Sequence, residues 1–404
     1  MLAKWFVRWS GVSSAVSGWR ICRGNCFWIP VLFLATGISA KSSGVYTASS
    51  AMAAGQASAH CAFPKHEWSR IDHAQQAQWD VQKLSLAHQY ADRIHSSSVM
   101  IVQCGRVVEE WGDPTKKITS FSVRKSLISA LYGIYSAEGV IDINQTLEQA
   151  GIDDSPSPLS KDERQARIVD LLRARSGVYH AADFETDFQK KIRPARGSHA
   201  PGTFWFYNNW DFNTLGTIFE KKTGLKIGDA FYQRIAKPIG MQDFRPNDVY
   251  YVGDGAVSTH PAFMFEMSAR DMARFGLLYL SHGRWRGHQI VPEAWVEKST
   301  HATEMVHIGH MPVGGYEYLW WVEYGGVAMG EATLPGMYSA QGAGGHIILV
   351  VPSRNLVIVN RYDNEPLAQD PKSVLLAAQD RKAIFDDDLS HLVKLILDAQ
   401  IVRQ

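Results

Sequence analysis

The segment FSVRKSLISALYG (residues 121–133) places a serine three positions before a lysine, Ser122 and Lys125, at the start of an apolar run. Apolar residues recur here at helical spacing and Gly139 supplies a stop, which predicts an amphipathic helix with Ser122 in or just before its first turn. Residues three apart lie on the same face of a helix. The hydroxyl and the amine are therefore expected to point the same way.

This serine–lysine pair has two interpretations. In the first, the serine caps the helix and the lysine is solvated, as in most chance S-x-x-K patterns. In the second, the hydroxyl is a nucleophile and the lysine is its base. Lysine accepts a proton only when neutral, and its pKa in water is about 10.4, so burial or a nearby cation must lower the pKa. Unpaired N–H groups of the first turn would also stabilise negative charge on oxygen.

Composition indicates a soluble globular protein with a large core, since 46% of the 404 residues are hydrophobic and 20% are charged. The formal net charge of +1 does not indicate nucleic acid or an acidic surface as a partner. No cysteine and histidine spacing suggests a metal site, and HIGH (residues 307–310) is predicted to be a surface loop. We expect neither a metal nor a cofactor.

The N-terminus is typical of a secretory signal. Residues 1–40 contain four basic residues and no acidic one, and FWIPVLFLATGISA (residues 27–40) runs apolar and ends in small residues. Pro30 interrupts the run, which is short for a membrane span. We predict a signal peptide over residues 1–40, a flexible leader over residues 41–60 and a periplasmic or secreted protein. It would be anchored to a membrane only if the segment stays uncleaved.

Strand patterns stand at both ends of the remaining chain. SVMIVQC and RVVEEWG (residues 98–112) predict a β-hairpin, and HIILVVP and NLVIVNR (residues 346–361) predict two more antiparallel strands. Helical patterns occupy the middle, and a C-terminal amphipathic helix closes the chain. This distribution predicts an α/β (α+β) fold: an antiparallel sheet flanked by N- and C-terminal helices, with an inserted, mainly helical region.

The predicted hydrolase domain covers residues 61–404, with the sheet over about 61–125 and 260–404 and the helical part over about 126–259. Ser122 then lies where the two parts meet, and such junctions are where catalytic clefts form. Cys61 and Cys104 would remain after signal cleavage in an oxidising compartment. They form either a disulfide or two separate buried thiols.

Two further motifs follow the serine–lysine pair. PGTFWFYNNWDFNTLG (residues 201–216) contains Tyr207 and Asn209 in a Y-x-N pattern, and an apolar helix is predicted after Asn213. A tyrosine passes protons, and an asparagine orients a lysine or a substrate carbonyl. SAQGAGGHIILVVP (residues 339–352) places several glycines before a strand, which suits an oxyanion hole, although a tight turn or bulge needs glycine equally. No G-x-S-x-G motif is present.

The order Ser-x-x-Lys, Tyr-x-Asn, Gly-rich strand edge resembles the serine β-lactamase and penicillin-binding-protein superfamily. It is most similar to the class C β-lactamase-like branch, which includes family VIII esterases and aminohexanoate-oligomer hydrolases. The resemblance extends from about residue 98 to the C-terminus and includes the stretches LLRARSGVYH, RIAKPIGMQDF, SARDMARFGLLYL and HGRWRG.

The resemblance implies a role for each motif residue. Ser122 is the expected nucleophile, Lys125 its proton acceptor and Tyr207 the acid and base of acylation and deacylation. Asn209 is expected to support Lys125 and the substrate. The backbone N–H groups of Ser122 and Ala343, the latter next to Gly342, are expected to form the oxyanion hole.

The chain departs from the family at the third motif. Where the family has Lys-Thr-Gly or His-Thr-Gly, this chain has Ala340, Gln341 and Gly342. The missing basic residue usually engages the carboxylate of a β-lactam or peptide. We therefore predict an extracytoplasmic serine hydrolase acting on small-molecule esters or amides. The alternatives are a β-lactamase or D-Ala-D-Ala peptidase with a basic group from elsewhere, and a catalytically silent binding module. Four tryptophans line an apolar pocket or pack in the core: Trp205, Trp210, Trp320 and Trp321.

Overall fold

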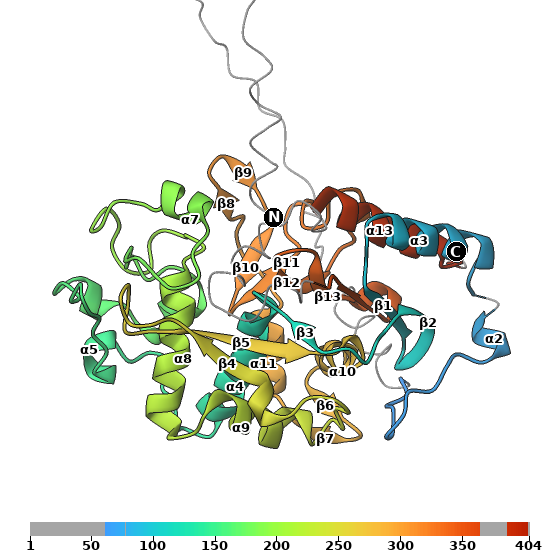
Figure 1. Cartoon of the computed structure of the whole chain (residues 1–404), viewed down its shortest axis with the longest axis horizontal. Helices are drawn as coiled ribbons and strands as arrows, with labels where there is room; N and C mark the ends of the chain where they lie inside the picture. Colours follow the sequence, from blue (N-terminus) through green and yellow to red (C-terminus); the bar gives the residue numbers. More distant parts are fainter. Residues whose placement is uncertain (1–60, 77, 364–385, 403–404) are drawn as a thin grey trace, which may run out of the picture.

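The computed structural model describes residues 61–76, 78–363 and 386–402 (Figure 1). The signal and leader predicted over residues 1–60 lie outside these ranges. The centre of the molecule is an antiparallel sheet of seven strands in the order β10-β11-β12-β13-β14-β1-β2. These strands are β1 (Ser98–Gln103), β2 (Arg106–Gly112), β10 (Gly315–Glu317), β11 (Trp320–Val322), β12 (Tyr338–Gly342), β13 (His346–Val351) and β14 (Leu356–Arg361).

The two ends of the chain meet inside this sheet. β1 pairs antiparallel with β14, with Ser98 opposite Arg361 and Gln103 opposite Leu356. β1 also pairs with β2 through the predicted hairpin. The turn of that hairpin is Cys104 and Gly105, both in the left-handed region at φ 45° and 76°, as a two-residue turn of this kind requires. The predicted sheet, completed by N- and C-terminal segments, is confirmed.

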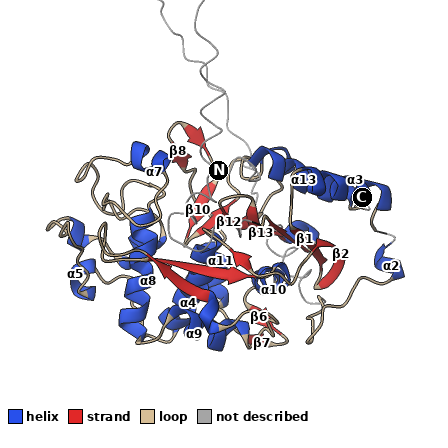
Figure 2. Ribbon diagram, in the orientation of Figure 1, coloured by secondary structure: helices blue, strands red, loops and turns tan. Residues whose placement is uncertain are grey.

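Side chains that alternate along a strand pack on opposite faces of the sheet, in two separate hydrophobic cores. Met100 and Val102 of β1 contact one core, whereas Val99 and Ile101 contact the other. The second core is covered by α3 (Val81–Arg93) and α13 (Asp386–Ala399), which pack side by side (Figure 2). The first core lies under α4 (Val123–Ala137) and α10 (Ala269–Leu280). The predicted flanking by N- and C-terminal helices is confirmed.

The helical region lies beside the sheet, at the left of Figure 1. Its helices are α5 (Leu147–Ala150), α6 (Ile168–Leu172), α7 (Asp187–Ile192), α8 (Asn209–Thr223) and α9 (Ile227–Phe231). The stretch ERQARIVDLLRAR (residues 163–175), part of the helical pattern predicted for the middle of the chain, forms a 3₁₀ turn followed by the five-residue α6. A small second sheet has the order β3-β5-β4, with the strands β3 (Ile118–Thr119), β5 (Ala262–Met267) and β4 (Val249–Val252).

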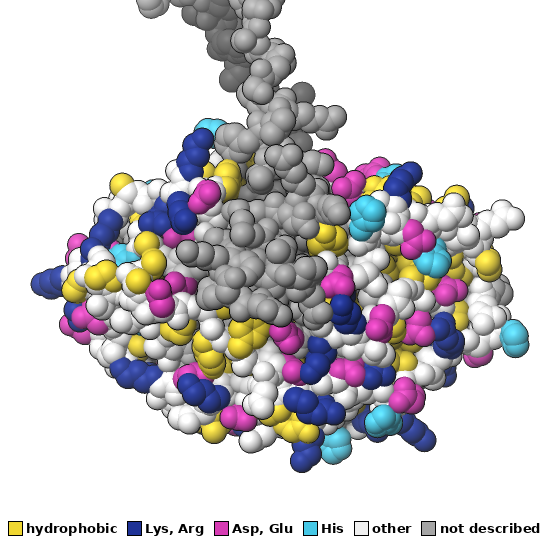
Figure 3. Space-filling view, viewed as in Figure 1, with side chains coloured by type: hydrophobic (Ala, Val, Ile, Leu, Met, Phe, Trp, Pro, Cys, Tyr) yellow, Lys and Arg dark blue, Asp and Glu magenta, His cyan; other side chains and the backbone are white. Residues whose placement is uncertain are grey.

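Shorter elements complete the described chain: α2 (His73–Gln76), β6 (Arg284–Trp285), β7 (His288–Gln289), α11 (Glu293–Ser299), β8 (His307–Ile308) and β9 (Met311–Pro312). HIGH forms β8 and the β8–β9 turn, and both of its histidines are exposed at the surface. On the face drawn in Figure 3, basic and acidic side chains are interspersed. No helix in the described ranges combines the length and apolar character needed to cross a bilayer.

The helix α4 begins and ends as predicted, but it is not amphipathic. Gly139, just past its end, is in the left-handed conformation at φ 74°. Every residue from Val123 to Tyr135 is buried, because the sheet packs on one side and α8, α9 and α11 pack on the others. The polar side chains in this stretch are therefore buried as well.

Cys61 and Cys104 form a disulfide, which decides between the two alternatives left open by the sequence.

Candidate active site

Ser122 lies in a tight turn between β3 and α4. Before it, Ser120 N donates to Phe265 O (2.8 Å) and Phe121 has a φ of 48°, a left-handed conformation that costs a non-glycine residue on the order of 1–3 kcal/mol. Ser122 occupies the N-cap position of α4, yet its hydroxyl makes no capping hydrogen bond. The interpretation of this serine as a simple helix cap is therefore wrong.

Lys125 is at the centre of the site, and its side chain is only 2% exposed. Its Nζ lies 2.8 Å from Ser122 Oγ, 2.8 Å from Tyr207 Oη and 3.2 Å from Asn209 Oδ1. Burial, followed by the charge of Arg124, holds the pKa of Lys125 well below its usual value. A neutral amine has two N–H bonds and one lone pair. Because the Asn209 oxygen can only accept, the lone pair is free to face a hydroxyl.

Three aromatic rings pack around Tyr207. It stacks on Trp321 (5.3 Å between ring centroids) and meets Tyr316 edge-on (5.8 Å) and Phe212 at a tilt (4.9 Å). Burial raises the pKa of Tyr207 to about 12. The phenol therefore keeps its proton at neutral pH, beside both Lys125 and Ser122.

Asn209 is the first residue of α8 and lies in its first turn. The helix begins four residues before the predicted start at Asn213, because Asn208 accepts a hydrogen bond from Trp210 N as the N-cap. Asn209 Nδ2 donates to Phe184 O (2.6 Å), which fixes the orientation of the amide. The amide oxygen is thereby aimed at Lys125.

Gly342 brings the edge of the sheet against the turn that carries the serine. A Cβ at this position would lie 2.4 Å from Ser120 O and 3.3 Å from Phe121 Cβ, so only glycine permits the approach. Ala343 follows in the β12–β13 turn. Within the described chain, the N–H groups of Ser122 and Ala343 have no backbone acceptor. The strand β12 itself was not predicted.

Ala340 occupies the position where the family has a basic residue. It is fully buried in β12, and its side chain belongs to the core under α4. The neighbouring Gln341 is on the opposite side of the strand and donates to Ser339 Oγ (2.8 Å). Neither side chain brings a positive charge to the site.

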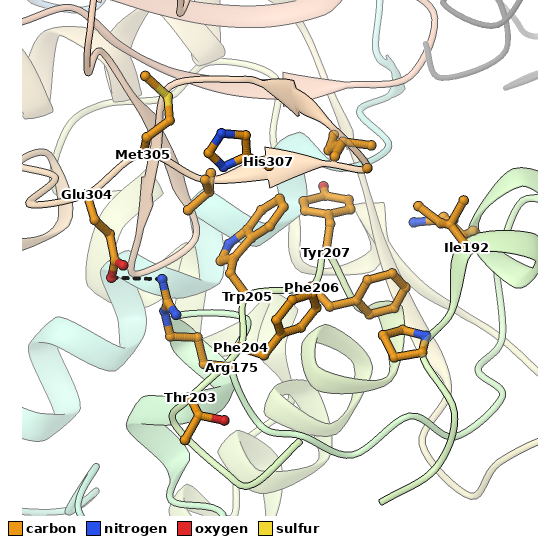
Figure 4. A pocket seen from close by; sticks show the side chains of 15 residues that line it. Arg175, Ile192, Thr203, Phe204, Trp205, Phe206, Tyr207, Glu304, Met305 and His307 are labelled. Carbon is orange, nitrogen blue, oxygen red and sulfur yellow. Dashed lines mark ion pairs between the residues drawn. The ribbon is translucent and has the colours of Figure 1, made fainter. Parts of the chain in front are cut away.

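A cavity of about 340 Å³ opens beside Tyr207 (Figure 4). Phe204, Trp205 and Phe206 form much of its wall, and a pair of charged residues, Arg175 and Glu304, lies at one end with 2.8 Å between nitrogen and oxygen. Ser122 is not part of the wall, so Tyr207 links the cavity to the serine–lysine pair. The tryptophans are divided between the two expected roles: Trp205 lines the cavity, Trp321 stacks on Tyr207, and Trp210 and Trp320 are fully buried.

The family model described as Beta-lactamase matches residues 75–379, about three quarters of the chain. The chain belongs to the β-lactamase family. Its recognition from three short motifs is confirmed, as is the predicted β-lactamase-like fold. No curated protein matches the chain. As a member of this family, the protein is a serine hydrolase.

Solved structures of β-lactamase-like proteins resemble this one in fold. A Bacillus anthracis protein assigned as a 6-aminohexanoate-dimer hydrolase is 19% identical, with a TM-score of 0.55 over 77% of this chain and 85% of its own. A Bacteroides dorei protein assigned as a β-lactamase is 16% identical, with a TM-score of 0.53 over 79% and 99%. A family VIII carboxylesterase is 14% identical, with a TM-score of 0.51 over 74% and 96%.

Four residues of this β-lactamase-family site were not singled out from the sequence. Arg124 lies between Ser122 and Lys125 in the segment that opens α4, and Asn213 lies one helical turn after Asn209. That spacing could have drawn attention to both. Arg175 and Glu304 lie far apart in the sequence, and only the folded chain brings them together at the cavity.

Proposed function

We propose that this protein hydrolyses esters or amides through an acyl-enzyme on Ser122. The observation that carries the proposal is the position of Lys125 Nζ, which is buried and lies 2.8 Å from both Ser122 Oγ and Tyr207 Oη. A buried amine next to a second cation is an effective base at neutral pH, because its neutral form is favoured. A solvated lysine would lack this property.

Acylation begins when Lys125 takes the proton of Ser122 as the oxygen attacks the substrate carbonyl. The carbonyl oxygen becomes an oxyanion and accepts hydrogen bonds from the N–H groups of Ser122 and Ala343. The proton then passes from Lys125 through Tyr207 to the leaving alcohol or amine. The C–O or C–N bond breaks, and the acyl group remains on Ser122.

Deacylation runs the same proton path in reverse. Tyr207, with Lys125, accepts a proton from a water molecule that attacks the acyl carbon. The ester bond to Ser122 breaks, its oxygen takes the proton back, and the acid product leaves. Asn209 keeps Lys125 in place throughout, since its amide is fixed by the Phe184 carbonyl.

The substrate class follows from the cavity and from Ala340. The aromatic wall beside Tyr207 favours an apolar acyl or alcohol group. Ala340 offers no charge to a carboxylate next to the scissile bond. Both features favour esters and amides without such a carboxylate.

We propose a periplasmic or secreted location for this activity. The basic, apolar and small-residue order of residues 1–40 supports export. The Cys61–Cys104 disulfide supports an oxidising compartment. Association with a membrane would require that the N-terminal segment remain attached.

The wild-type protein is expected to hydrolyse p-nitrophenyl butyrate faster than the β-lactam nitrocefin. Ala340→Lys should raise nitrocefin turnover relative to ester turnover, since a charged hydrogen bond contributes roughly 1.5–3 kcal/mol, or about 10- to 150-fold in binding. Ala340→Met is the matched control, because it adds similar length without charge. The measurement is kcat/KM for both substrates with all three proteins.

A wild-type protein that prefers nitrocefin would contradict the ester preference and favour the β-lactamase or peptidase alternative. One observation supports that alternative: Arg175 supplies a positive charge in the cavity, although it is paired with Glu304. Inactivity toward every ester, amide and β-lactam tested would favour a silent binding module.

A further inference from the structure

Within the described chain, Arg124 is a buried cation without a carboxylate partner. Its side chain is 1% exposed, and its guanidinium lies over the Phe263 ring at 4.5 Å from the centroid. One nitrogen donates to Asn213 Oδ1 (3.0 Å), and its other two nitrogens have no partner among the described residues. Arginine is seldom fully buried unless it is paired, because desolvation of the charge is costly. The position of this arginine therefore calls for an explanation.

Arg124 and Lys125 are each held by an asparagine whose amide also bonds to a backbone carbonyl. They are consecutive on α4, and their partners Asn209 and Asn213 are one turn apart on α8. Asn209 Oδ1 accepts from Lys125 (3.2 Å) and its Nδ2 donates to Phe184 O (2.6 Å). Asn213 Oδ1 accepts from Arg124 (3.0 Å) and its Nδ2 donates to the adjacent carbonyl, that of residue 183 (3.0 Å). A neutral amide holds each basic group without cancelling its charge.

We propose that Arg124 is a positioning residue whose uncompensated positive charge, held in place by Asn213, keeps the neighbouring Lys125 in its neutral, proton-accepting form. This inference rests on the proposed role of Lys125 as the base. It assigns to Arg124 the nearby cation that, together with burial, lowers the pKa of the lysine base.

The ionisation of both groups agrees with this role. Burial lowers the pKa of Arg124 to about 10, so its charge persists at neutral pH. Burial first, and the charge of Arg124 second, hold the pKa of Lys125 well below its usual value. Removing that charge should therefore raise the pKa of Lys125. More of the lysine would then be protonated, and unable to accept the serine proton, at a given pH.

Within the described chain, no carboxylate forms an ion pair or a hydrogen bond with Arg124. The titratable groups whose charge would act on Arg124 are the phenols of Tyr207 and of Tyr316 on β10, and burial raises the pKa of both, so they keep their protons.

Two buried carboxyl groups lie on neighbouring segments. Burial raises the pKa of Asp211 on α8, whose oxygens accept hydrogen bonds from Ser176 and Asn208, and burial raises the pKa of Asp183 to about 6. Burial keeps the pKa of His346 on β13 low, so it is uncharged. Glu317 on β10 is buried and paired with Arg173 (2.7 Å). The other charged residues of these elements are at least partly exposed: Glu220, Lys221 and Lys222 on α8, Asp229 on α9, Glu266 on β5, and Glu293, Glu297 and Lys298 on α11.

The test is the pH dependence of kcat/KM for a p-nitrophenyl ester. In the wild type, kcat/KM rises with pH as Lys125 loses its proton. Arg124→Met and Arg124→Gln both remove the charge, and the glutamine retains an N–H donor for Asn213. In both variants, we expect the rise of kcat/KM with pH (the acid limb of the profile) to shift to higher pH by about 1–3 units. Activity below the limb should fall by roughly 10-fold per unit and recover at higher pH.

Arg274→Met is the matched control. Arg274 is also fully buried with a pKa lowered by burial to about 10, but it holds the backbone carbonyls of Lys65, His66 and Ile239 instead. Its loss should lower the melting temperature without moving the limb. An unmoved limb in both Arg124 variants, with activity lost equally at every pH, would overturn the inference.

Lys125→Met, measured alongside, separates this inference from the proposed function. If Lys125→Met remains active, lysine is not the base and the proposed function fails. If Lys125→Met is inactive while both Arg124 variants keep the wild-type limb, only the role of Arg124 is wrong.

Discussion

Replacing Ser122 with alanine is expected to abolish ester hydrolysis, with a loss of roughly 10⁴-fold or more in kcat. The substitution removes the proposed nucleophile, and neither Lys125 nor Tyr207 can replace it. The fold should be almost unaffected, because the Ser122 hydroxyl makes no capping bond to α4. The measurements are steady-state kinetics with p-nitrophenyl butyrate and the melting temperature of both proteins.

Ser126→Ala is the matched control for this prediction. Ser126 is fully buried one turn further along α4, where its hydroxyl donates to Leu319 O (2.7 Å). Its removal should lower stability by about 1 kcal/mol and leave most of the activity. A Ser122→Ala protein that keeps most of its activity would show that the nucleophile has been assigned wrongly.

Lys125→Arg is expected to slow acylation by roughly two orders of magnitude or more, the usual effect of losing a general base. Arginine keeps much of the length of lysine, but it stays protonated at any ordinary pH and therefore has no lone pair to accept a proton. It would also place a second guanidinium beside Arg124 in a buried site. The measurement is the rate of the pre-steady-state burst of p-nitrophenol, which reports acylation alone.

The pH dependence of the wild-type protein belongs to the same prediction. Since the pKa of Lys125 is lowered, its base activity should be present above that lowered pKa and lost as the pH falls through it. An arginine variant that acylates as fast as the wild type would rule out proton transfer to Lys125.

The sequence predicts the parts of the site that depend on local spacing. Ser122 and Lys125 are three residues apart at a helix start, and that spacing alone places both groups on one face. The strands at both ends of the chain likewise predict a sheet that joins them, and β1 pairs with β14. The glycine-rich strand edge can lie against the turn that carries Ser122 because position 342 is glycine. Any side chain there would clash with the backbone oxygen of Ser120.

Tertiary packing determines what the sequence does not predict. The apolar spacing of α4 predicts one buried face, yet α8, α9, α11 and the sheet enclose all of it. Arg124, which the sequence analysis did not single out, is therefore fully buried in the fold. The Arg175–Glu304 pair joins two segments distant in sequence, and no local pattern indicates that they share a cavity.

Intact-protein and peptide mass spectrometry after treatment with a fluorophosphonate tests the central claim most directly. The probe reacts with an activated serine and stays bound through a phosphorus–oxygen bond. We expect a single adduct in the wild-type protein, on the peptide that contains Ser122, and none in Ser122→Ala. An adduct on another serine, or no adduct in a preparation that hydrolyses p-nitrophenyl butyrate, would contradict an acyl-enzyme on Ser122.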